Sequence, residues 1–96
     1  MPDMGKIYSE LGSGFCIVKE GKILENYLLS DFEIEWIKKL LPLIDFFPKD
    51  FELGIFEFDM NRRFGVFKIE DKFLLFPART DNLGEIIRKK GAIYEA

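Results

Sequence analysis

Few side chains in this sequence could perform covalent or acid–base chemistry. The chain of 96 residues contains no histidine and a single cysteine, Cys16. Histidine-based catalysis, His-ligated metal sites and a cysteine-rich structural zinc site are therefore excluded. Cys16 lies in the apolar run 15–18, and no imidazole exists to activate it. We therefore interpret Cys16 as a buried, inert thiol rather than a nucleophile.

Two carboxylates, Glu57 and Asp59, have the spacing that places both on one face of a strand, where a glycosidase pair could act. Arg63 and Lys68 follow on the next predicted strand and can neutralise them. We interpret the four as a solvated ladder of opposite charges. Because no activated acid, base or nucleophile is visible, we predict that the protein is not an enzyme and has no catalytic, cofactor-binding or metal-binding residues.

Three further polar motifs also have structural explanations. The Gly-Ser-Gly sequence at 12–14 lacks the lysine of a phosphate-binding loop and predicts a turn. Arg62 and Arg63 at a hairpin tip could reach a nucleotide phosphate as an arginine finger does, but exposed turn arginines more often only aid solubility. The basic residues 88–90 could contact an acidic lipid or partner, but cations also favour a helix C-terminus for electrostatic reasons.

Composition narrows the class of protein. Hydrophobic residues make up 48% of the chain, including 11 phenylalanines, enough for one core without disulfides or a metal. The net charge of −3 supplies no field that would attract nucleic acid. No secretion signal or membrane-spanning run is visible, and a lone cysteine fits a reducing compartment. We expect a single cytoplasmic domain, residues 1–96, with no nucleic-acid or membrane partner. Because the chain is rich in Lys, Glu, Ile and Phe, we also expect it to come from a heat-adapted source.

Turn and capping signals predict the first elements. The apolar runs 15–18 and 23–29 flank a Lys-Glu-Gly-Lys turn and predict a β-hairpin. Ser30 and Glu33 then have the spacing of a capping box, which predicts a helix over 31–47.

The second half of the chain predicts three strands and a helix. Strands over 51–59, 63–70 and 73–77 are joined by short turns and predict an antiparallel meander. A last helix is predicted over 82–90, with Gly just beyond it as its C-cap. The N-terminal segment, residues 1–13, is either a short helix or disordered.

The meander carries apolar residues on both faces of each strand. The alternating pairs are Leu53 and Ile55 against Phe56 and Phe58, Phe64 and Val66 against Phe67 and Ile69, and Phe73 and Leu75 against Leu74 and Phe76. A sheet with two apolar faces needs a cover on each side. The sequence therefore predicts an α+β fold whose elements follow one another along the chain as ββαβββα. The five strands form one antiparallel sheet, with helices on both of its faces.

The helix predicted over 31–47 carries more apolar surface than one contact with a sheet requires. Its apolar face, which spans roughly half the circumference, has Ile37, Leu40 and Ile44 at the centre and Ile34, Leu41, Trp36, Leu43 and Phe47 on its flanks. We predict that one flank meets the same helix of a second copy, with Trp36 either an interface anchor or a core residue. The alternative is that a kink at Pro42 turns the extra residues into one subunit's own core.

Three stretches of the chain resemble the roadblock family of dynein light-chain type, which includes bacterial and archaeal partners of Ras-like GTPases. Residues 15–24, Phe-Cys-Ile-Val-Lys-Glu-Gly-Lys-Ile-Leu, are similar to the family's opening hairpin. The helix and the three-strand meander resemble its middle. The residues at 78–88, Ala-Arg-Thr-Asp-Asn-Leu-Gly-Glu-Ile-Ile-Arg, resemble the entry into its last helix. The family usually begins with a full helix over one sheet face, and residues 1–11 are short for that role.

The resemblance implies a profilin- or roadblock-like sheet with strand order 2-1-5-4-3, and homodimers joined through the middle helix and third strand. It also implies regulation of a small Ras-like GTPase. We therefore expect a non-enzymatic homodimeric adaptor or regulator; the second hypothesis is a small-molecule sensor with an apolar pocket lined by phenylalanines. The expected interface residues are Trp36, Leu40, Leu43, Phe47, Leu53 and Ile55.

Overall fold

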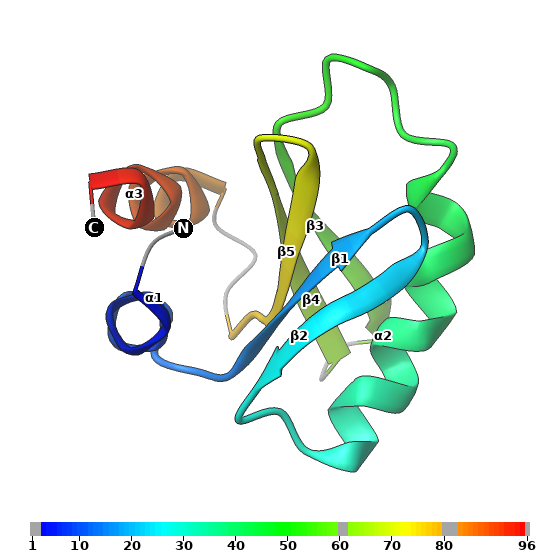
Figure 1. Cartoon of the computed structure of the whole chain (residues 1–96), viewed down its shortest axis with the longest axis horizontal. Helices are drawn as coiled ribbons and strands as arrows, with labels where there is room; N and C mark the ends of the chain where they lie inside the picture. The colour runs from blue at the N-terminus through cyan, green and yellow to red at the C-terminus, as the bar shows by residue number, and fades with distance from the viewer. Residues whose placement is uncertain (1–2, 60–61, 80–82, 96) are drawn as a thin grey trace.

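A computed structural model describes residues 3–59, 62–79 and 83–95. The chain is an α+β domain with a five-stranded antiparallel sheet and helices on both of its faces (Figure 1), as the sequence predicted. Its elements in chain order are α1 (Met4–Leu11), β1 (Phe15–Lys19), β2 (Lys22–Tyr27), α2 (Asp31–Ile44), β3 (Leu53–Asp59), β4 (Arg62–Ile69), β5 (Lys72–Pro77) and α3 (Leu83–Glu95).

The strand order in the sheet is β2-β1-β5-β4-β3, the order expected from the family resemblance. The two hairpins meet at the centre, where Cys16 and Val18 of β1 lie opposite Leu75 and Phe73 of β5. This long-range pairing joins the first hairpin to the meander. It leaves β2 and β3 as the two edge strands.

Helix α2 covers one face of the sheet, and α1 and α3 lie on the opposite side (Figure 1). The strand residues predicted to alternate do so, and each set joins a separate core. The core under α1 and α3 takes Leu53, Ile55, Phe67, Ile69, Leu74 and Phe76, and the core under α2 takes Phe56, Phe58, Phe64, Val66, Phe73 and Leu75.

The N-terminal segment forms a helix of eight residues, which settles the two alternatives for its residues 3–11. The Asp3 side chain accepts a hydrogen bond from the Lys6 backbone N–H, and Gly12 ends the helix at a φ of 72°. Ile7 and Leu11 are buried against the sheet beside Ile86 of α3. Helices α1 and α3 therefore cover this face of the sheet together.

Helix α2 begins where predicted and ends three residues early. The Ser30 hydroxyl accepts from the Glu33 N–H at 3.1 Å, and the Glu33 carboxylate accepts from the Ser30 N–H at 2.9 Å, which completes the capping box. At the other end, Phe46 and Phe47 donate to carbonyls only three residues back, so the α-helical spacing stops at Ile44.

Helix α3 is longer than predicted, because Gly91 lies inside it rather than beyond its end. The residue that extends the helix is Ile93, whose side chain is 1% exposed in the core. Its burial offsets the cost of about 1 kcal/mol that a glycine imposes on a helix interior.

Gly65 of β4 and Gly91 of α3 form a matched pair for testing this packing. A Cβ added at Gly65 would overlap the ring of Phe76, whereas one added at Gly91 meets nothing within 4 Å. We expect Gly65→Ala to lower the free energy of unfolding by about 1–3 kcal/mol through overpacking. Gly91→Ala should raise it by up to about 1 kcal/mol through helix propensity. Urea unfolding followed by circular dichroism measures both; equal stability of the Gly65→Ala variant and the parent would contradict the packing described.

Candidate functional site

The only cysteine of the sequence occupies the centre of the sheet. Cys16 is fully buried between neighbouring strands β2 and β5. Burial raises the pKa of its thiol to about 12, against a smaller lowering effect of the backbone at Leu75. A thiol with this pKa carries almost no thiolate at neutral pH, as an inert core residue does. The burial of Cys16 that the sequence predicted is confirmed.

The carboxylates of β3 pair with the arginines of β4. Glu57 lies opposite Arg63, with 3.1 Å between its Oε2 and the Arg63 Nε, and Asp59 pairs with Arg62. This confirms the charge ladder, although Lys68 takes a different role and donates to a backbone carbonyl. Both hairpin arginines are thus engaged with carboxylates of their own subunit.

The residues predicted to form the interface do not share one surface. Leu40 is 1% exposed under α2 and has no surface to offer to a partner, so its assignment is corrected. Leu53 and Ile55 are half-buried on the sheet face below α1 and α3, opposite to α2. Trp36 and Leu43 lie on the outer flank of α2, and Leu43 is 47% exposed.

Phe47 turns inward, because α2 ends before it. Its ring centroid lies 4.4 Å from that of Phe51, 5.2 Å from that of Phe56 in a stacked geometry, and 5.7 Å from that of Phe73. The helical projection that placed Phe47 beside Trp36 does not hold beyond Ile44. Phe47 therefore mainly fills the core at the end of α2.

An exposed stripe runs along the outer flank of α2 and into the turn after it; we call it the α2 seam. On the helix its members are Phe32, Trp36, Lys39 and Leu43, at spacings of 4, 3 and 4 residues, and the exposed Phe46 follows in the turn after α2. That spacing is typical of helices that pack side by side. Phe32 is 60% and Phe46 84% exposed. The sequence reasoning missed both, because it centred the helical projection on the buried face instead of counting the outer heptad.

Trp36 is half-buried at the middle of the seam and joins it to the sheet. Its ring centroid lies 4.8 Å from that of Phe58 on β3 and 6.4 Å from that of Phe32. The Arg62 Cζ and Lys39 Nζ lie 4.7 Å and 4.2 Å from the same centroid, within range of cation–π attraction. Trp36 thus packs on the core and stays partly exposed, and its role as an interface anchor remains a prediction.

The two edge strands differ in how they are protected. Strand β2 has a bulge at Leu24, where Val18 pairs with Ile23 and Ile17 with Glu25, and it carries charged residues. Bulges and charges discourage pairing with another chain. Strand β3 keeps a regular register from Leu53 to Glu57, whereas β2 is interrupted at its middle. Its own irregularity and its two acidic residues, Glu57 and Asp59, lie at its end, and it contains no lysine or proline. Its apolar edge is therefore the more suitable of the two for receiving another strand.

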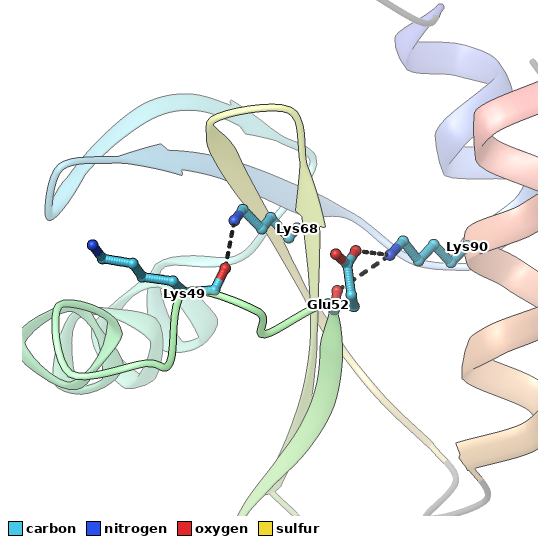
Figure 2. Close-up of polar contacts among 4 residues, drawn as sticks. All are labelled: Lys49, Glu52, Lys68 and Lys90. Carbon is cyan, nitrogen blue, oxygen red and sulfur yellow. Dashed lines mark hydrogen bonds and ion pairs between the residues drawn. The ribbon is translucent and has the colours of Figure 1, made fainter.

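The segment before β3 is fixed by lysines (Figure 2). The Lys90 ammonium of α3 lies 2.8 Å from the Glu52 carboxylate and 3.4 Å from the Glu52 carbonyl. The hydrogen bond from Lys90 and then its charge lower the pKa of Glu52. The Lys68 ammonium donates to the Lys49 carbonyl at 3.1 Å. Strand β3 therefore enters the edge of the sheet from a defined position.

The cavity among the apolar residues Ile7, Ile17 and Leu74 has a volume of about 20 Å³. This is room for about one water molecule, far below the roughly 300 Å³ of a small-molecule pocket. It gives no support to the hypothesis of a sensor with an apolar pocket.

The fold is a small α+β domain with an exposed, largely apolar stripe along α2. No protein-family model matches the chain. A protein of Archaeoglobus fulgidus, described as uncharacterized, is 46% identical to it over 84 residues, which cover 88% of this chain and 85% of the relative. The chain therefore belongs to the same family as this archaeal protein. None of the helices in the described ranges is long and apolar enough to span a membrane.

Asp71, in the turn between β4 and β5, is held by two lysines. The Lys19 Nζ lies 2.8 Å from its Oδ2 and the Lys72 Nζ 3.2 Å from its Oδ1. The hydrogen bonds from Lys19 and Lys72 lower the pKa of Asp71 from 3.8 to about 2. This contact fastens the end of β1 to the neighbouring hairpin.

The Asp71 contact predicts a pH dependence of stability. Because the folded-state pKa lies below the unfolded value, the contact stabilises the fold above about pH 4 and is lost as the pH falls toward 2. We expect Asp71→Asn to be less stable than the parent at pH 6, and the difference to disappear near pH 2. Urea unfolding between pH 2 and 6 measures it. Glu10→Gln, at an exposed position, is the control; a parent–variant difference that does not change with pH would contradict the prediction.

Proposed function

We propose that this protein is a non-enzymatic homodimeric adaptor that binds a partner protein, a small Ras-like GTPase or its complex. The observation that carries the dimer is the α2 seam, an apolar stripe left uncovered beside an open, regular edge strand. The proposal for the partner rests on the resemblance to the roadblock family. Its support in this chain is that the strand order and the placement of α2 match what the resemblance implies.

A second copy is the occupant that suits both features of this surface. Antiparallel pairing of β3 with β3 of the second copy would continue the sheet and place both α2 helices on one face. An antiparallel seam centred on Lys39 would set Trp36 against Leu43 of the second copy, and Phe32 against Phe46. These contacts remove large apolar side chains from water, each worth up to about 1.5–3 kcal/mol when fully buried.

Lys39 gives this pairing its register. At the centre of the seam it would face Lys39 of the second copy, a like-charge contact that carries a cost. The Lys39 ammonium lies over the Trp36 ring, which offsets part of that cost. A single polar residue in an apolar seam commonly sets register at some expense of stability. The face covered by α1 and α3 remains free in such a dimer for a further protein.

Leu43→Asp tests the dimer. A charge placed in an apolar interface should weaken dimerisation at least about 30-fold, because truncating or charging a central contact costs ~2 kcal/mol or more. Size-exclusion chromatography with light scattering should find the parent as a dimer of two 11.3 kDa chains and the variant as a monomer at micromolar concentration. Ile87→Asp is the matched control, because Ile87 is a similarly exposed apolar residue, at 56%, on α3. A parent that stays monomeric would overturn the proposal.

The partner is tested with a purified archaeal Ras-like GTPase, loaded in turn with GDP and with a non-hydrolysable GTP analogue. We expect the immobilised parent dimer to bind one nucleotide state at least about tenfold more tightly than the other, because a regulator must distinguish the two states. Biolayer interferometry measures both affinities. Absence of binding in both states would remove the GTPase from the proposal, while the light-scattering result would stand by itself.

A further inference from the structure

A polar cleft lies on the side of the sheet away from α2. Its volume is about 390 Å³, within the range of small-molecule sites. The C-terminal end of α1, the end of β5 and the first two turns of α3 form its walls. Its lining residues are Leu11, Gly12, Ser13, Pro77, Arg79, Glu85 and Lys89.

Arg79 differs from the other three arginines of the chain. Arg62, Arg63 and Arg88 each pair with a carboxylate of their own subunit. Arg79 makes no ion pair or hydrogen bond in the described structure, and it is the arginine that lines the cleft. A guanidinium offers five N–H donors in a fork that matches a carboxylate or phosphate group.

Lys89 supplies a second cation at a fixed position in the cleft. Its ammonium donates to the Leu11 carbonyl at 3.1 Å, which ties α3 to the end of α1. An ammonium has three donors, so two remain available. The one acidic lining residue, Glu85, lies 3.6 Å from the Arg88 guanidinium. The Arg88 guanidinium therefore balances part of the Glu85 charge. The remaining negative charge of Glu85 repels an anion, which favours its binding beside Arg79.

We infer that this cleft binds a small anion through a carboxylate or phosphate group, with Arg79 and Lys89 as its cationic ligands. The half-buried Pro77 then contacts the uncharged part of the molecule. The Ser13 hydroxyl lies in the same wall, where it donates to the Gly14 carbonyl at 3.2 Å and the Pro77 carbonyl at 3.5 Å, and it can exchange these contacts for one to the anion. The site does not depend on the dimer, because α2 and β3 contribute none of the lining residues.

Titration of the full chain, labelled with nitrogen-15, tests the inference by amide chemical shifts. Inorganic phosphate and acetate are added in separate experiments, each at constant ionic strength. We expect saturable shifts at the amides of Ser13, Arg79 and Lys89 with at least one of them. Saturation by phosphate alone would assign a phosphoryl ligand, and saturation by acetate alone a carboxylate ligand.

Arg79→Gln should raise the dissociation constant at least about tenfold, the loss expected for a charge-assisted hydrogen bond. Lys38→Gln removes a positive charge on α2, on the opposite side of the sheet from the cleft, and should change the constant by less than about twofold. Three results would overturn the inference: no saturable shift with either anion, unchanged binding by the Arg79 variant, or equal loss in both variants, which would indicate only general charge attraction. The exposed position of Arg79 allows its variant to fold.

Discussion

A sheet that is apolar on both faces is the constraint on which the rest of this structure depends. At its centre, Phe15 and Ile17 of β1 point to one core while Cys16 and Val18 point to the other, and all four are buried. Neither face can be left to water, so helices must lie on both sides. The eight residues of α1 help to cover the sheet face opposite α2. On the other side, α2 turns Ile37, Leu40 and Ile44 toward the sheet, and the rest of its circumference faces outward.

The two edges of the sheet are protected differently. A five-stranded open sheet must expose two edges, and each unpaired edge invites association. The bulge and the charges of β2 discourage pairing, whereas the lysines around Glu52 hold the start of β3 in place. The register of β3 is then regular from Leu53 to Glu57, a mainly apolar stretch. Trp36 links this edge to α2 by packing on Phe58. The edge and the seam therefore form one continuous surface, on which the proposed dimer depends.

Local signals in the sequence located most elements because each depends on neighbouring residues. The Ser30 and Glu33 spacing fixed the start of α2, since a capping box is satisfied within one turn. Errors appeared where distant contacts decided the outcome. Gly91 reads locally as the end of a helix, but the burial of Ile93 carries α3 past it. Phe47 reads as an outward helical residue, but stacking on Phe56 draws it inward.

The sequence by itself determined the two-faced sheet, the order of elements and the burial of Cys16, because alternation, capping and burial of apolar residues follow from local pattern. Only the tertiary structure decided which apolar residues remain outside. It buried Leu40, left Phe32 and Phe46 exposed, and brought Arg79 to a cleft beside Lys89. These outcomes depend on where separate segments meet in space. A helical projection or a residue spacing describes one segment and does not say which other segments will pack against it.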